Sequence, residues 1–384
     1  MSVCMKTERD FGRCSQEGFS LIELMVASAI GLMIMAAILT LYLNVTRTND
    51  EMAKTNIMVE NGRFAIQLLQ DDIAHAGFWD GFIPDFDDLS LKVGETPVDT
   101  FTSIPTPCLN YADSWSSAHK NRRVGMVIQA YGAMPSSCSG LLSSYKANTD
   151  ILIVRHAATC VAGTAGCDAD EAGKLYFQAS RCRTDASRYV LAKTGHDLKK
   201  MDCLTPADKR RFVYNVYYVR SFSVSAGDGV PTLMRSQMAL DGTLGTPEPL
   251  VEGVEGFRVE LGFDHVSDSG ASIIDLSSNS DPYRASINWA DDERTSPTNR
   301  GDGIPDEFLH CSGSSGCVED KLVHVVAVKL HLLMRSNLST PGYVDGKSYV
   351  LGGQTITAAN DSFKRHVFST VVRLNNVSAR RETP

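Results

Sequence analysis

The chain has 384 residues, a length that allows one large domain or one domain with an appendage. Hydrophobic residues make up 43% of it and charged residues 21%, both ordinary for a folded protein. The formal net charge of −8 argues against nucleic acid as a partner, because phosphate binding requires a basic surface. Cations and anions before Phe19 cancel, so the part after Gly18 carries the whole excess.

The first predicted element is an apolar run over residues 21–43 whose single charge is Glu23. As a helix the run spans about 35 Å, enough to cross a bilayer core of about 30 Å. A signal peptide or a plain signal anchor is the alternative. The cleavage-like sequence Ala27-Ser28-Ala29 lies inside the run rather than after it, which favours a retained membrane helix.

Glu23 is an unusual residue for such a helix. An ionised carboxylate at the centre of a membrane helix costs on the order of 3 kcal/mol, so such residues usually have a partner. A cut between Gly18 and Phe19 would create an α-amine four residues before Glu23. The amine of a neighbouring subunit could then neutralise the carboxylate when helices bundle. Glu23 is therefore a candidate assembly residue.

The sequence GFSLIELMVA over residues 18–27 resembles the type IV prepilin cleavage motif. The resemblance implies a leader peptide over residues 1–18, a prepilin peptidase that cuts after Gly18, and methylation of the new amine of Phe19. Glu23 falls on the fifth mature position, where the family carries its glutamate. Many major pilins have a helix-bending proline near Thr40, and this segment has none.

The helix is expected to run over residues 19–77, with a transmembrane part at 21–43 and an amphipathic part at 44–77. Apolar side chains recur in it every seven residues, namely at Val45, Met52, Val59, Ile66 and Ile73. The stripe fits packing on the chain's own globular domain, which we favour for its C-terminal half, or contact with neighbouring helices in a filament core. Ala76-Gly77 predicts the end of the helix.

Residues 78–384 have the pattern of a β-rich globular domain. Alternating apolar and polar residues predict strands at 125–131, 150–156, 174–179, 189–193, 211–224, 257–263, 326–335 and 368–374. The longest loop-like stretch is 267–316. We therefore predict an α+β, pilin-like fold in which a long N-terminal helix packs on an antiparallel sheet.

Eight of the ten cysteines follow the apolar run, and Cys4 and Cys14 precede it. An even number on one side of a membrane segment suits disulfides in an oxidising compartment. Eight cysteines allow about 100 complete pairings. Chain order favours two short loops first and two longer loops second: Cys160 with Cys167, Cys311 with Cys317, Cys108 with Cys138, and Cys182 with Cys203. A zinc site is the alternative, disfavoured because no CxxC pair occurs.

Three later segments resemble PilW-like minor pilins. They are LVEGVEGF at 250–257, before a central strand, and the late strands at 325–336 and 366–375. The resemblance implies a minor pilin held in the inner membrane with a periplasmic domain, then built into the pilus at the cell surface. The large size of the globular domain suggests that few copies enter each pilus, in a tip complex that primes assembly. Expected partners are prepilin peptidase, other minor pilins, the major pilin and a tip adhesin, with a role in twitching motility and adhesion.

No motif typical of a hydrolase, a zinc protease or a nucleotide-binding enzyme occurs, so we predict that the chain is not an enzyme. His324 and His331 are seven residues apart on one predicted strand and point to opposite faces. The alternatives to a minor pilin are a minor pseudopilin of type II secretion, a membrane-tethered periplasmic binding protein, and a tethered enzyme.

The segment NRGDGIPDE at 299–307 partly resembles an acidic calcium loop. Asp302 and Asp306 match ligand positions, but Thr298 and Arg300 fall where carboxylates should be, and an arginine opposes a cation. A turn-rich loop is the alternative. We expect no cofactor, with calcium at Asp302 and Asp306 as the alternative.

Overall fold

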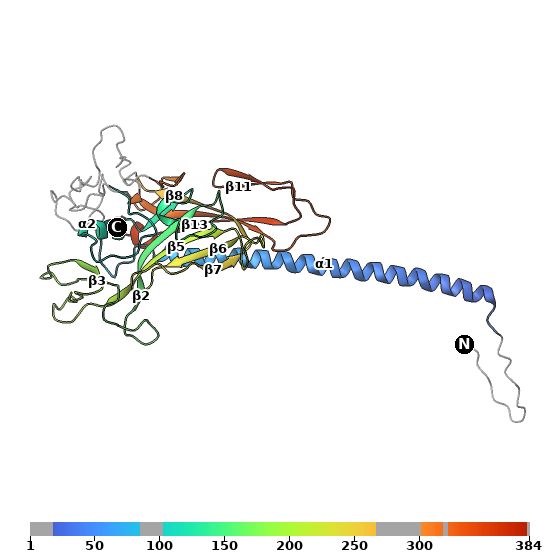
Figure 1. Cartoon of the computed structure of the whole chain (residues 1–384), viewed down its shortest axis with the longest axis horizontal. Coiled ribbons are helices and arrows are strands. Elements are labelled where there is room, and N and C mark those ends of the chain that lie inside the picture. The colour runs from blue at the N-terminus through green and yellow to red at the C-terminus, as the bar shows by residue number, and fades with distance from the viewer. Residues whose placement is uncertain (1–17, 85–102, 266–300, 318–321, 382–384) are drawn as a thin grey trace, which may run out of the picture. The chain divides into compact units, whose positions relative to one another are not determined.

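The computed structural model describes residues 18–84, 103–265, 301–317 and 322–381. The chain divides into two units, Met1–Ala53 and Lys54–Pro384. The helix α1 (Leu21–His75) begins in the first unit, and its second half belongs to the second unit with all the strands (Figure 1). The predicted leader up to residue 17, with Cys4 and Cys14, lies outside the described residues.

Helix α1 ends where the sequence predicts. Its last residue is His75, and Gly77 has a φ of +74°, in the left-handed region that favours glycine. The N–H of Gly77 donates to the carbonyl of Arg155 (3.1 Å), so the chain leaves the helix directly onto the first sheet.

The buried face of α1 differs from the predicted seven-residue stripe. Its buried residues are three or four apart, as one face of a helix requires: Met58, Gly62, Ala65, Leu69 and Ile73. Of the predicted stripe only Ile73 is buried, while Val59 and Ile66 are half-buried. The C-terminal half of the predicted stripe therefore packs on the domain, with Ile73 buried and Ile66 against the core. The prediction missed Gly62 and Ala65 of the buried face, because it counted only large apolar side chains.

The first sheet has seven antiparallel strands in the order β1-β2-β5-β3-β4, with β6 paired to β5 and β7 paired to β6. Its strands are β1 (Ile128–Tyr131), β2 (Ile151–Val161), β3 (Tyr176–Ala179), β4 (Tyr189–Ala192), β5 (Lys209–Arg220), β6 (Thr232–Gln237) and β7 (Glu248–Glu252). The long central strand β5 is buried over most of its length, because sheet and helix cover both of its faces.

The second sheet has the antiparallel order β13-β10-β8-β9, and a separate hairpin pairs β11 with β12. Its strands are β8 (Val254–Phe263), β9 (Glu307–His310), β10 (Val325–Arg335) and β13 (Arg365–Arg373). The hairpin strands are β11 (Ser348–Leu351) and β12 (Gln354–Thr357), and the short helices are α2 (Ser117–Gly125) and α4 (Asn375–Ser378). The long helix and antiparallel sheets confirm the predicted fold class.

The eight predicted strands correspond to β1, β2, β3, β4, β5, β8, β10 and β13. Helix α2 and the shorter strands β6, β7, β9, β11 and β12 were not predicted. Strand β9 falls inside the predicted loop 267–316, so that prediction was wrong for residues 307–310. Four residues at a sheet edge carry too little periodicity to stand out from a loop.

Candidate functional site: the long helix and its anchor

The N-terminus of α1 is closed by a reciprocal pair, Ser20 and Glu23. The Glu23 carboxylate accepts hydrogen bonds from the backbone N–H and the hydroxyl of Ser20, both at 2.9 Å. In return the Ser20 Oγ accepts the Glu23 N–H at 3.2 Å. This is a capping box, which satisfies two helix N–H groups that have no partner within the helix. The capping box was not predicted, although the S-x-x-E spacing of Ser20 and Glu23 is its sequence signal.

Both Ser20 donors bind the same carboxylate oxygen, Oε2 of Glu23. The other oxygen, Oε1, accepts no hydrogen bond from any described residue. Gly18 and Phe19 precede the helix in non-helical conformation, and the Phe19 side chain is 89% exposed. The predicted cleavage site and the predicted assembly residue therefore lie within one short segment, with one acceptor oxygen unused.

The N-terminal part of α1 is long and apolar enough to cross a membrane. Its most apolar 18-residue window has a mean hydropathy of 2.4, and none of that window is buried. An unburied apolar helix of this length is stable when lipid or other helices cover it.

The second half of α1 is anchored to the first sheet through Asp72. Its carboxylate accepts hydrogen bonds from His156 Nε2 (3.0 Å), Asn215 Nδ2 (3.0 Å) and Tyr217 O–H (2.9 Å). Burial raises the pKa of Asp72, but these hydrogen bonds and the attraction of His156 outweigh it, so the pKa lies below its ordinary value. The sequence did not mark Asp72 as an anchor, because a single acid on a polar helix is usually exposed to solvent.

On the second sheet, α1 packs closely against β13. A Cβ added at Gly62 would lie only 2.3 Å from the ring of Phe368, so glycine makes room for that ring. Further along, Gln70 Nε2 donates to Thr370 Oγ1 (3.0 Å). Asn61 Nδ2 also donates to the carbonyl of Glu252, at the end of β7 (3.3 Å). The second half of α1 is thus fixed to both sheets.

Four disulfides close loops in Lys54–Pro384, and they are the four pairs that chain order favours. They join Cys108 to Cys138, Cys160 to Cys167, Cys182 to Cys203 and Cys311 to Cys317. All eight sulfurs are paired, which leaves no thiolate among the described residues for a zinc ion. Disulfides at this density are typical of an oxidising compartment.

The two candidate calcium ligands bond to nearby backbone. Asp302 Oδ1 accepts the N–H of Ile304 (2.8 Å), and Asp306 Oδ2 accepts the N–H of His265 (2.7 Å). Thr298 and Arg300 lie outside the described residues. Within the described part of the chain, no group of three or more His, Cys, Asp and Glu residues could hold a metal ion. Calcium binding stays a prediction.

His324 and His331 belong to separate contacts. The ring of His331 bonds to Ser369 Oγ (2.8 Å) and Glu260 Oε2 (3.0 Å), whereas His324 contacts the guanidinium of Arg381 (3.1 Å). Different partners hold the two rings, so they form no common site.

Two family models match separate parts of the chain. The family model described as "Prokaryotic N-terminal methylation motif" matches residues 13–39, which include Phe19 and Glu23. The family model described as "Type IV Pilus-assembly protein W" matches residues 216–376, from β5 through β13. The chain is a PilW-like minor pilin of the type IV pilus system.

Among solved structures, this PilW-like chain is similar to "Type IV-like pilin TTHA1219 from Thermus thermophilus". The identity is 13%, the match covers 61% of this chain and 82% of the other, and the TM-score of 0.23 is too low for comparing the folds in detail. No curated protein sequence matches the chain.

The two family matches confirm the predicted class and do not favour its alternatives, the type II pseudopilin and the tethered binding protein. A PilW-like pilin with this motif is processed by prepilin peptidase and assembles with other pilins. It is a membrane-anchored pilin with a globular domain, and the family match suggests a structural role.

Proposed function

We propose that this chain is an inner-membrane minor pilin that enters the pilus through α1 after cleavage between Gly18 and Phe19, and that it supports the start of assembly in a tip complex. The observation that carries the proposal is the unused oxygen Oε1 of Glu23. The capping box occupies only Oε2, so a cation can bind Oε1 without breaking the N-terminus of the helix.

The cation that fits is the α-amine that cleavage creates on a neighbouring subunit. In lipid, a carboxylate and an ammonium attract each other strongly, because both lose the solvation that water provides. The pairing sets the height of one helix against the next, since it joins residue 19 of one chain to residue 23 of another. Methylation of Phe19 keeps the amine able to carry its charge.

The size of the globular domain and its attachment to α1 support a position at the tip. Lys54–Pro384 is one compact unit of 331 residues (384 minus 53), large for a subunit repeated on every turn of a thin fibre. The second half of α1 belongs to this unit, so the helix brings the whole domain into the assembly. The four disulfides support a periplasmic location before assembly. Other minor pilins, the major pilin and a tip adhesin are the proposed partners.

The experiment is the Glu23→Gln substitution in cells that lack the wild-type chain. Glutamine keeps the acceptor oxygen that Ser20 needs but cannot attract the neighbouring amine by charge. We expect normal cleavage on immunoblots and at least about a tenfold loss of surface pili, because a charge pair in lipid is worth more than 1.4 kcal/mol. The matched control is Asp50→Asn, which removes an acid from the same helix outside residues 21–43.

Normal piliation with Glu23→Gln would refute the role of the carboxylate. Immunogold labelling tests the location separately: gold at pilus ends supports the tip complex, and gold along the whole shaft contradicts it. Loss of protein secretion without loss of twitching would return the type II pseudopilin as the better assignment.

A further inference from the structure

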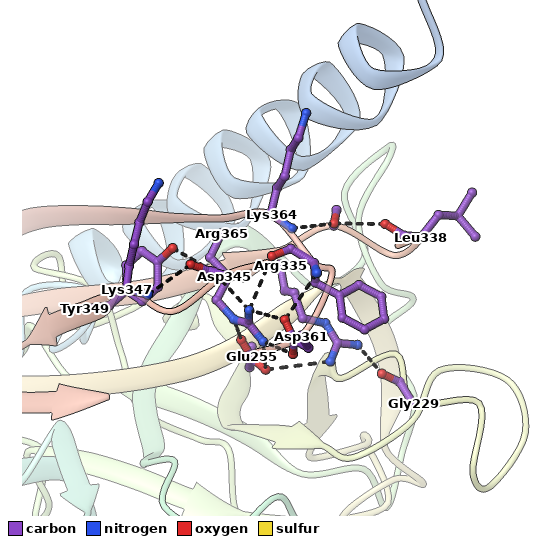
Figure 2. A network of polar contacts seen from close by, with 12 residues as sticks. Gly229, Glu255, Arg335, Leu338, Asp345, Lys347, Tyr349, Asp361, Lys364 and Arg365 are labelled. Atoms are coloured by element: carbon purple, nitrogen blue, oxygen red, sulfur yellow. Dashed lines mark hydrogen bonds and ion pairs between the residues drawn. The ribbon is translucent and has the colours of Figure 1, made fainter. Parts of the chain in front are cut away.

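The segment between β10 and β13 carries the β11–β12 hairpin, and a buried ion network holds this segment in place (Figure 2). The guanidinium of Arg365, only 3% exposed, bonds to three carboxylates: Glu255 (3.1 Å), Asp345 (3.1 Å) and Asp361 (2.6 Å). Tyr349 of β11 donates its hydroxyl to Asp345 as well (2.9 Å).

The network ties the hairpin segment to the second sheet. Glu255 belongs to β8, Arg365 to β13, and the two aspartates to the segment itself. Arg335 of β10 adds an ion pair to Glu255 (3.7 Å) and a hydrogen bond to the carbonyl of Gly229. Because both ends of the segment are fixed, the hairpin presents its strands in a preset position.

Among the described residues, neither outer edge of this two-stranded hairpin has a strand beside it, and the β12 edge is the more polar of the two. Strand β12 pairs with β11 alone. The N–H of Ala358 donates to the carbonyl of Lys347 (3.0 Å), and antiparallel ladders alternate, so the peptide groups of Thr355 and Thr357 point away from β11. Natural edges are usually blocked by proline, by charged side chains or by a covering segment. Residues 354–358 contain neither proline nor a charge.

A cavity of about 340 Å³ adjoins this edge. Residues 354–359 line it, together with Asn148, Lys146, Glu255 and Arg365. The charged groups that line it are two cations and one anion, an excess of one positive charge. A cavity of this size holds two or three residues of an extended chain, within the range of known ligand sites.

Two groups at the cavity lack partners. The ammonium of Lys146 forms no ion pair or hydrogen bond with any described residue, and burial lowers its pKa. The Oε1 atom of Gln354 is buried without a hydrogen bond in the described part of the chain. A buried polar atom without a partner is costly, so a ligand that donates a hydrogen bond to Gln354 Oε1 removes that cost. An anion on the same ligand would also pair with the half-buried Lys146.

We propose that the outer edge of β12 and the ammonium of Lys146 form a docking site for an extended segment of a partner polypeptide that carries a carboxylate side chain. The partner's backbone would pair with Thr355 and Thr357, as strands do when they add to a sheet edge. Its carboxylate would bind Lys146, and a backbone or side-chain N–H would bind Gln354. This inference concerns a surface other than the α1 N-terminus and does not depend on the tip location.

A peptide fits better than other ligands because of the spacing. Thr355 and Thr357 present N–H and carbonyl groups two residues apart, the repeat of a facing strand. An apolar helix would leave Lys146 and Gln354 unsatisfied. An acidic polysaccharide would satisfy Lys146 but cannot reproduce the strand ladder, and the experiment below separates the two.

The test uses the full mature chain in detergent micelles against an array of 12-residue peptides. The peptides tile the extracytoplasmic parts of the other pilins and pilus-tip proteins of the same organism. We expect bound peptides to contain Asp or Glu. Lys146→Met should weaken binding by about tenfold or more, as expected for loss of a charge-assisted hydrogen bond, whereas Lys146→Arg should retain it.

Thr357→Pro removes an outward-facing N–H and places a ring at the edge, so we expect it to abolish binding. The matched control is Val350→Pro, which changes an outward-facing position on the opposite edge of the same hairpin and should leave binding unchanged. Lys146→Met leaves the hairpin backbone intact, so it still tests the site if either proline disturbs folding, as checked by thermal unfolding.

Equal loss of binding in Thr357→Pro and Val350→Pro, with both folded, would overturn the edge assignment. Binding of no peptide by the wild-type chain would overturn the proposal as a whole. Alginate that binds the wild-type and Thr357→Pro chains equally well, while peptides fail, would show a carbohydrate site instead. None of these results bears on Glu23 or on cleavage at Gly18.

Discussion

The anchor of α1 gives a quantitative prediction for Asp72→Asn. The substitution keeps the shape of the side chain but removes the charge that His156, Asn215 and Tyr217 share. Hydrogen bonds to a charged group contribute about 1.5–3 kcal/mol each, and donors left unsatisfied in a buried site add to the loss. Since the new amide can satisfy some partners, we expect the free energy of unfolding to fall by about 3 kcal/mol.

The assay is urea unfolding of the full chain in detergent, followed by tryptophan fluorescence. Trp79, 1% exposed, lies just beyond the end of α1 and reports on the packing there. The control is Asp71→Asn, the neighbouring exposed acid of the same helix. We expect it to stay within about 0.5 kcal/mol of the wild type, as surface substitutions usually do.

The pH dependence provides a second check on Asp72. Its pKa is lowered in the folded chain, so the stabilisation is fully present above the unfolded value of about 3.9 and is lost as the pH falls through the folded value. The loss in free energy of unfolding caused by Asp72→Asn should therefore be complete at neutral pH and should shrink in strong acid. A variant as stable as the wild type at neutral pH, or a deficit that acid does not reduce, would refute this account.

Two further predictions concern packing and disulfides. Gly62→Leu should destabilise the chain by about 1–3 kcal/mol through overpacking against Phe368, and adding Phe368→Ala should recover part of the loss; an additive double variant would argue against the contact. Replacing both cysteines of the Cys108–Cys138 loop should cost about 3.5 kcal/mol, against about 2.5 for Cys311–Cys317, since the loops span 30 and 6 residues. The reverse order in urea unfolding would contradict the loop-entropy argument.

The sequence was informative where a pattern is local. The apolar run with its single acid, the stop at Gly77 and the longer strands could be predicted, because each depends on neighbouring residues. The disulfide partners also followed chain order, because each pair is adjacent among the cysteines that follow the apolar run.

The anchor of α1 and the free edge of β12 could not be predicted. Asp72 bonds to residues more than 80 positions away, and no local signal marks such a contact. The buried face of α1 includes Gly62 and Ala65, which a search for large apolar side chains passes over. An unpaired edge is a property of the assembled sheets rather than of the residues in the strand.

The N-terminus of the chain purified from cell membranes tests the central claim most directly. Mass spectrometry of the N-terminal peptide should find the mature chain beginning at N-methylated Phe19, which places the amine four residues from Glu23. A chain that still begins at Met1, or that begins beyond Ala29, would contradict the assignment as a pilus subunit.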